Sequence, residues 1–178
     1  MDAKDVLNFW FEELYPIQWF QGGADLDETI TQRFSHVHKA AVNGELYTWR
    51  TNALGRLAEI IVLDQFSRNI YRGKPEAFAN DQMALTLAQE MVMFELDEML
   101  PVSMRAFAYM PYMHSESPIV HEEAVRLFSS EGMEENLNFE FEHKKIIDQF
   151  GRYPHRNEIL ERSSSLSEIE FMKTHQGF

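Results

Sequence analysis

Residues 57–68 read Leu57-Ala58-Glu59-Ile60-Ile61-Val62-Leu63-Asp64-Gln65-Phe66-Ser67-Arg68. The first seven are apolar at nearly every position, so a helix formed by them is apolar on almost all sides and belongs at the centre of a fold. Such a helix needs neighbours on several faces. Apolar residues recur at intervals of three and four along the whole chain, whereas the alternation of a half-buried strand is hard to find. The sequence therefore predicts an all-α protein built around this segment.

Proline and glycine divide the rest of the sequence into further helices, because Pro cannot continue a helix and Gly favours its end. Helices are expected over about residues 2–15, 25–43, 52–70, 75–95, 101–111, 118–131, 135–150 and 165–172. Eight or nine helices with short connections, and no Ser/Gly-rich linker, predict a single domain over residues 1–178 that packs as antiparallel hairpins.

A five-residue motif occurs twice, at a spacing of 84 residues. Asp64-Gln65-Phe66-Ser67-Arg68 returns as Asp148-Gln149-Phe150-Gly151-Arg152, and another Arg follows four residues after each copy, as Arg72 and Arg156. Repeated helix–turn units usually stack and bury a shared core, as in tetratricopeptide arrays. The spacing differs from the regular repeat of about 34 residues. An irregular, tetratricopeptide-like array is therefore expected.

The charged residues of the motif allow two interpretations. Asp and Arg are four apart in each copy, which places them on one helix face and lets them pair. In the first interpretation, the Arg side chains are structural and bind free carbonyl groups at the two helix ends. In the second, they line one cleft with two histidines and bind a carboxylate or phosphate, which Arg recognises through paired hydrogen bonds. The ligand-binding candidates are Asp64, Arg68, Arg72, His143, Asp148, Arg152, His155 and Arg156.

Several segments together resemble a known bacterial family. They are Phe9-Trp10-Phe11 with Trp19-Phe20, the segment from Leu63 to Gly73, Tyr109-Met110-Pro111 followed by His114-Ser115-Glu116, and the segment from Phe150 to Asn157. Over nearly its whole length the chain is similar to the family called domain of unknown function 924. The resemblance implies a tetratricopeptide-like all-helical fold and transfers no catalytic role, because the family has no established activity. Met113 and Glu161 stand where the family often has Glu and Gly.

His114-Ser115-Glu116 is the main candidate for acid–base chemistry, with His155 as a further candidate. A histidine and a carboxylate can transfer protons or bind a metal. His114 and Glu116 are only two residues apart in an expected loop, which is poor spacing for a metal site. Ser115-Glu116-Ser117 can equally cap the helix that begins at Pro118. No metal and no cofactor is expected, since the phosphate-loop and dinucleotide motifs are missing. His36 and His38 are expected on the surface.

Composition limits the partners of the protein. Its 178 residues include 29 acidic and 16 basic ones and no Cys, with a formal net charge of −13. This excess disfavours binding to nucleic acid or to an anionic membrane surface. No apolar run approaches the roughly 20 residues of a spanning helix and no leader segment is recognisable, so a cytoplasmic protein is expected. Residues 74–142 carry 14 acidic and 3 basic residues, whereas residues 143–178 carry 5 and 6, which predicts an acidic shell around a cationic cleft.

Three functions remain open from the sequence. The preferred one is a binding module for a small anion or a peptide carboxylate in the cleft lined by Arg and His. The second is an enzyme acting on a small anionic substrate, with His114 or His155 as acid or base and Glu116 or Asp148 orienting it. The third is a scaffold with buried Arg–Asp pairs. The sequence does not indicate the oligomeric state.

Overall fold

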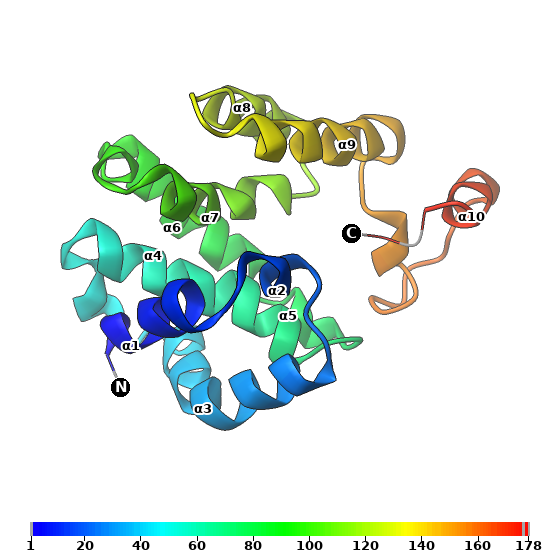
Figure 1. Ribbon diagram of the computed structural model, residues 1–178. Helices are drawn as coiled ribbons and strands as arrows, with labels where there is room; N and C mark the ends of the chain where they lie inside the picture. The colour runs from blue at the N-terminus through cyan, green and yellow to red at the C-terminus, as the bar shows by residue number, and fades with distance from the viewer. Residues whose placement is uncertain (1, 176, 178) are drawn as a thin grey trace.

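The computed structural model describes residues 2–175 and 177, and every regular element in that part of the chain is helical (Figure 1). The α-helices are α1 (Ala3–Asn8), α2 (Pro16–Phe20), α3 (Ala24–Val42), α4 (Ala53–Ile61), α5 (Ser67–Ile70), α6 (Asp81–Met93), α7 (Val102–Met113), α8 (Pro118–Phe128), α9 (Glu134–Phe150) and α10 (Leu166–Met172). Short 3-10 and π-helical turns join several of them. The expected all-α fold is confirmed.

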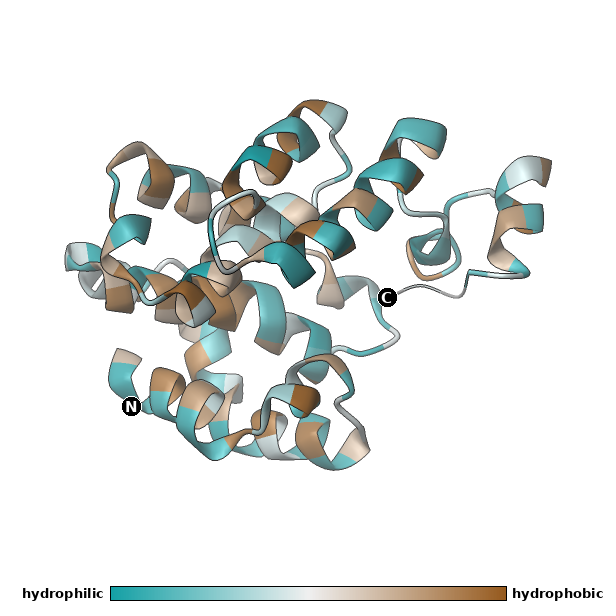
Figure 2. Cartoon of the chain, turned by 45° about the horizontal axis from the view of Figure 1, so that its top comes forward, coloured by the Kyte–Doolittle hydropathy of each residue, from teal (hydrophilic) through white to brown (hydrophobic). Residues whose placement is uncertain are grey.

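The central segment forms one continuous helical run. Helix α4 passes into a π-helical turn over Val62–Phe66 and then into α5, so the chain stays helical from Ala53 to Ile70. The side chain of Asn52 caps the run by accepting a hydrogen bond from the N–H of Gly55 at 2.9 Å. Residues 57–63 are fully buried, and α1, α6 and α7 pack around α4. Most helices alternate hydrophobic and hydrophilic residues around their turns, as helices with one buried face do (Figure 2).

Aromatic side chains fill the core beside this helix. The ring centres of Phe9, Phe34 and Phe66 lie 4.9 to 6.1 Å apart, and the indole ring of Trp10 lies 5.7 Å from the rings of both Phe66 and Phe107. Offset and edge-on contacts of this kind add to the burial of apolar area. The main core extends as one cluster from α1 to Met133.

His38 belongs to this interior, and the expectation of a surface position is wrong. Its side chain is buried, and its Nε2 lies 2.8 Å from the hydroxyl of Ser67. The reason is that α3 packs against α5 and turns this residue toward it. His36, two residues earlier, points to the opposite side and is exposed, as expected.

Helices α6 to α9 pack in chain order, each against the next. Helices α8 and α9 form the edge of the molecule farthest from α1 and α3 (Figure 1). This succession agrees with the expected antiparallel hairpins, and the closer likeness to tetratricopeptide repeats stays a prediction. No helix in the described part of the chain has the length and apolar character needed to cross a membrane.

The C-terminal segment has a small core of its own. Helix α9 ends at Gly151, whose φ of +69° is the left-handed conformation that favours glycine. Ile146, Ile147 and Tyr153 then form a cluster separate from the main core, and α10 stands apart from the other α-helices (Figure 1). Glu161 has a φ of +54°, a left-handed conformation that favours glycine.

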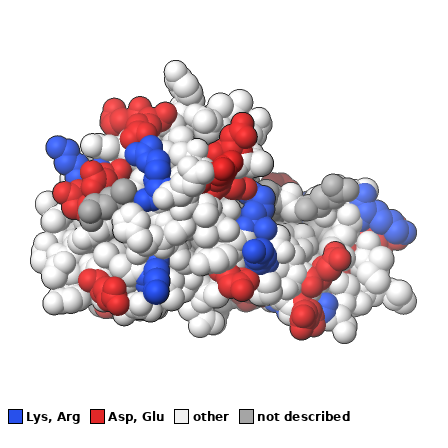
Figure 3. All heavy atoms as spheres, turned by 90° about the horizontal axis from the view of Figure 1, so that it is seen from below, with Lys and Arg blue, Asp and Glu red and all other residues white. Residues whose placement is uncertain are grey.

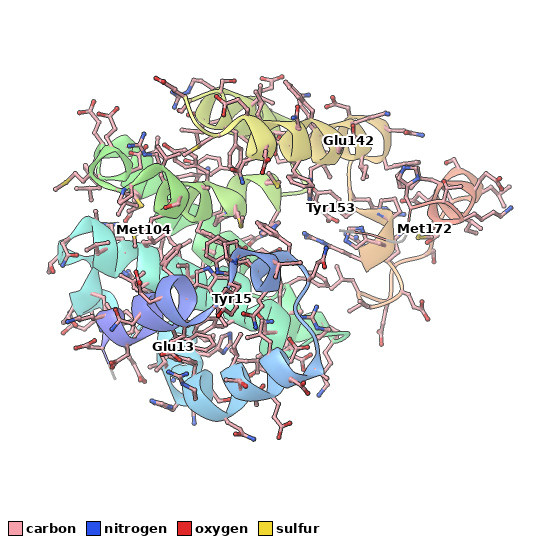
Figure 4. The ribbon with its side chains drawn as sticks, in the orientation of Figure 1. Glu13, Tyr15, Met104, Glu142, Tyr153 and Met172 are labelled. Carbon is pink, nitrogen blue, oxygen red and sulfur yellow. The ribbon has the colours of Figure 1, made fainter. Side chains whose placement is uncertain are left out.

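Polar contacts connect this segment to the main body. The guanidinium of Arg162 donates two hydrogen bonds to the carboxylate of Glu116, at 2.6 and 2.9 Å. The hydroxyl of Tyr153 donates to the carbonyl of Met113 at 2.5 Å. Tyr153 lies beneath α9 (Figure 4). Directional polar contacts therefore add to the packing of α9 on α8 at the junction between the two cores.

Candidate functional site

A cavity of about 460 Å³ lies at this junction. Its walls come from residues around α2 and α5, from the end of α7, from α9 and from residues 153–159. The apolar lining residues include Trp19, Phe20, Phe78, Met110, Met113, Phe139 and Ile159, and the polar ones are Gln65, Arg68, Asn69, Arg72, His114, Asn136, His143, Tyr153, His155 and Arg156. Pockets of this size and mixed character are typical of sites for small molecules.

The first copy of the motif supplies one wall. Because the chain stays helical through Asp64 and Arg68, the two side chains share a face, and the Nη1 of Arg68 lies 3.1 Å from Oδ1 of Asp64. The same guanidinium makes two hydrogen bonds to Asp81 at the start of α6, at 2.9 and 3.1 Å. Burial lowers the pKa of Arg68, but Asp64 and Asp81 outweigh this and raise it. Arg68 therefore stays charged and fixed in place.

Arg156 reaches the same place from the far end of the chain. Its Nη1 lies 3.3 Å from Asp81 and its Nη2 donates to the backbone carbonyl of His114 at 3.0 Å. Its guanidinium carbon lies 4.6 Å from the ring centres of both Phe78 and Tyr153, close enough for cation–π attraction. The Nε of Arg156 is buried and has no hydrogen-bond partner. Two guanidinium groups thus share one carboxylate, that of Asp81.

His114 is paired with Asp64, fifty residues earlier in the sequence. Its Nδ1 lies 2.7 Å from Oδ1 of Asp64, whose other oxygen accepts a hydrogen bond from Gln65 at 2.6 Å. Burial opposes the charge on Asp64, but Arg68 and His114 hold the pKa of this carboxyl well below its usual range. Burial and the charge of Arg68 lower the pKa of His114 by more than Asp64 raises it. At neutral pH the pair is therefore a carboxylate and a neutral imidazole, with the proton of the ring on Nδ1.

Two more histidines line the cavity. The Nδ1 of His143 donates to the backbone carbonyl of Phe139 at 2.7 Å. Burial lowers the pKa of His143 to about 3, and burial with the charge of Arg156 lowers that of His155 to about 4. Both rings are neutral at pH 7, so the cations of the site are arginines.

No Asp or Glu is found among the cavity-lining residues in the described part of the chain, although three Arg are. The carboxylates that pair with them, those of Asp64, Asp81 and Asp27, lie behind the Arg side chains. In a protein with 29 acidic residues this arrangement leaves the cavity surface with cationic and neutral groups only.

The sequence profile of a bacterial family of unknown function, DUF924, matches residues 6–176. The chain belongs to this family. A solved structure of a protein of unknown function, ATU0120 from Agrobacterium tumefaciens, is similar to it with a TM-score of 0.92 and 34% identity, over 97% of each chain. No curated protein matches the sequence. The resemblance expected from the motifs is thus confirmed, and membership of DUF924 brings no activity with it.

The expected membership of the cleft is wrong for Asp148 and Arg152. Asp148 accepts two hydrogen bonds from Lys144 on the outer side of α9, and Arg152 pairs with Glu168 of α10 at 2.7 Å. Neither lines the cavity. The physical reason is Gly151, which ends α9 between them, so the Arg no longer follows the Asp on one helix face.

Glu116 is also outside the cavity, which corrects its expected role beside His114. Its carboxylate holds Arg162 and accepts a hydrogen bond from the backbone N–H of Tyr153 at 2.8 Å. Arg72 does reach the rim, where it forms an exposed ion pair with Asp27 at 2.5 Å. Arg68, His114, His143, His155 and Arg156 all line the cavity, and Asp64 lies directly behind His114.

Sequence reasoning missed Asp81 and Phe78, which receive both buried Arg side chains. Nothing in the local sequence of Asp81 marks an ion pair with residues 13 and 75 positions away. On the face seen from below, acidic and basic groups are interspersed over a mostly uncharged surface (Figure 3). The acidic shell expected from residues 74–142 stays a prediction. In the described residues no group of three or more His, Cys, Asp or Glu is placed to hold a metal ion.

Proposed function

We propose that this protein binds a small organic carboxylate with an apolar body in the cavity between its two cores. The observation that carries the proposal is the composition of the wall, where three Arg face the cavity and the described lining residues include no carboxylate. An anion placed there meets donors without meeting a like charge.

The Arg side chains retain donors for such a ligand. A guanidinium carries five N–H donors. Arg156 gives two hydrogen bonds, and Arg68 three, to acceptors in the described part of the chain. The carboxylates behind them fix their orientation, so little conformational entropy is lost when an anion binds.

The rest of the wall favours an apolar body on the ligand. Trp19, Phe20 and Phe139 surround one side, and the rings of Phe20 and Phe139 are stacked at 6.5 Å although both are largely exposed. A volume of about 460 Å³ suits a ligand of small-molecule size better than a folded peptide segment. We therefore favour a small carboxylate over a peptide carboxylate.

Isothermal titration with phenylacetate and its uncharged analogue phenylacetamide tests the proposal. Charge-assisted hydrogen bonds contribute about 1.5–3 kcal/mol, so phenylacetate is expected to bind at least about tenfold more tightly. Equal affinities, or no heat from either compound, would contradict the proposal.

A matched pair of variants at Met113 locates the effect in the cavity. Met113→Glu adds a carboxylate to the wall and is expected to weaken phenylacetate binding by about tenfold or more. Met113→Gln has the same shape without the charge and is expected to change it by less than about threefold. A similar loss in both variants would show that shape, rather than charge, controls binding.

A further inference from the structure

We propose that the cavity is an active site in which His114, oriented by Asp64, removes a proton from the carbon next to the keto group of a 2-oxo carboxylate, so that its keto and enol forms interconvert. This inference rests on the proposed function, because it requires the carboxylate to be held by the Arg side chains. It adds a reaction and a class of substrate to that site.

The geometry prepares His114 to accept a proton. Its Nδ1 lies 2.7 Å from Oδ1 of Asp64, which fixes the tautomer with the proton on Nδ1 and leaves the lone pair on Nε2. Asp64 is itself held by Arg68 at 3.1 Å and by Gln65 at 2.6 Å. The ring lines the cavity, so this base is aligned by a buried network on one side and accessible on the other.

The other lining residues narrow the chemistry. In the described part of the chain they include no Ser, Thr, Cys, Lys, Asp or Glu, so the wall offers an imidazole base and guanidinium cations without a hydroxyl, thiol or amine nucleophile of those types. Tyr153 turns its hydroxyl to the carbonyl of Met113 at 2.5 Å. Enolisation is a reaction that needs only a base and stabilisation of a developing oxyanion.

Arg156 places the substrate relative to the base. Its Nη2 is bonded to the backbone carbonyl of His114 at 3.0 Å, so the guanidinium adjoins the residue that carries the imidazole. A carboxylate held by Arg156 brings the two carbons that follow it close to His114. In a 2-oxo carboxylate these are the keto carbon and the carbon that carries the acidic hydrogen.

The reaction balances without a further reactant. The C3–H bond of the substrate breaks and an Nε2–H bond forms on His114, while the electron pair moves into the C2–C3 bond and the keto oxygen becomes an enolate oxygen. Asp64 stabilises the imidazolium, and the Arg side chains stabilise the enolate. Return of the proton to the oxygen gives the enol, and return to carbon restores the keto acid. No electron is gained or lost.

Phenylpyruvate is the probe, because it joins an aromatic body to a 2-oxo carboxylate. In weakly buffered D2O, exchange of its C3 protons is followed by NMR and its enol by ultraviolet absorbance, with and without the protein. We expect exchange well above the rate in solution for the wild-type protein. His114→Gln is expected to lower kcat by about 100-fold or more, whereas His36→Gln, an exposed histidine outside the cavity, leaves it unchanged.

Asp64 is a positioning residue, and its test needs a readout other than folding. Asp64→Asn offers an amide donor to Nδ1, so the ring proton moves to Nε2 and the lone pair no longer faces the cavity. We expect kcat to fall while KM for phenylpyruvate changes little, and the ¹⁵N signals of His114 to report the opposite tautomer. An unchanged tautomer together with an unchanged kcat overturns the role of Asp64.

Binding of phenylacetate, which does not enolise under these conditions, separates the two proposals. If the wild-type protein binds phenylacetate and does not accelerate exchange of phenylpyruvate, this inference fails and the proposed function stands. If neither compound binds, both fail. Exchange at the wild-type rate in His114→Gln also overturns the inference. If that variant does not fold, the inference is decided by whether the wild-type protein accelerates exchange above the rate without protein.

Discussion

The two copies of the Asp-Gln-Phe-x-Arg motif have the same letters and different structures. In the first copy the helix continues, so Asp64 and Arg68 form an ion pair at the wall of the cavity. In the second copy the helix ends within the motif, so Asp148 turns back to Lys144 and Arg152 turns away to Glu168. The residue at the fourth position decides the outcome, Ser67 in one copy and Gly151 in the other. The motif therefore determines which side chains are present, and the backbone at its fourth position determines whether the Asp and the Arg pair.

The second copy still contributes to the site, through the Arg that follows it. Arg156 is buried beside Phe78 and Tyr153 and meets Arg68 at Asp81, whereas its counterpart Arg72 is half exposed at the rim. Each copy thus sends one Arg deep into the junction, from different positions of the repeat.

Removal of the Asp in each copy should have the largest and most unequal effect. Asp64→Ala removes the buried partner of His114 and one of the two carboxylates that Arg68 contacts. A loss of this kind lowers the free energy of unfolding by about 3 kcal/mol or more. Asp148→Ala removes a surface pair on α9 and should cost less than about 0.5 kcal/mol. Urea denaturation measures both. Equal costs would mean that the copies are energetically equivalent.

The two histidines that flank the second copy, His143 and His155, should make stability depend on pH. The folded pKa of His143, about 3, is below its ordinary value of about 6.5, so the unfolded chain binds a proton that the folded chain does not. Stability is then lost as the pH falls below about 6.5, by up to about 1.4 kcal/mol per pH unit for this group.

Between pH 6.5 and 5 this loss is distinguishable from that of the buried carboxylates whose pKa is lowered. Burial raises the pKa of Glu140 instead, so this group opposes the loss, and it does so equally in the wild type and in the variants. The pKa values of Asp64 and Glu168 are lowered, so their contribution is present above the ordinary carboxyl pKa of about 4 and disappears only at lower pH. Denaturation curves in this window should be less sensitive to pH in His143→Gln than in the wild type, and His36→Gln should behave as the wild type. An unchanged slope in His143→Gln would contradict the assignment.

A smaller effect than that of Asp64→Ala should come from the position that separates the copies. Gly151→Ala places a Cβ at a φ of +69° and should cost about 1 kcal/mol. Gly151→Asn is the control, because asparagine adopts the left-handed conformation more readily than alanine and no atom lies within 4 Å of an added Cβ at Gly151. Similar melting temperatures for the two variants would show that Gly151 is not needed for its conformation.

Local features of the sequence were predictable because they depend on local physics. The central helix follows from its apolar run, and the Asp64–Arg68 pair follows from helical spacing. The end of α9 at Gly151 was also expected, but its effect on the second Asp–Arg pair was overlooked. A spacing of four brings two side chains together only when both residues lie in one helix, and Arg152 lies beyond the end of α9.

The partners in the site were not predictable, because they are distant in sequence. The sequence suggests Glu116 or Asp148 as the carboxylate that orients His114, whereas the partner of His114 is Asp64 across the fold. Asp81 joins Arg68 and Arg156 over separations of 13 and 75 residues. His38 was placed on the surface from its spacing alone and lies against Ser67. A single sequence predicts which residues share a helix face. Which faces contact one another depends on the packing between helices.

The position of Arg156 also separates the residues that complete the cavity from those that form the main core. The main core is complete by Met133, whereas the last wall of the cavity comes from residues 153–159. The main core therefore does not include the residues that complete the cavity. The cavity acquires this last wall only where the final segment crosses back to Asp81.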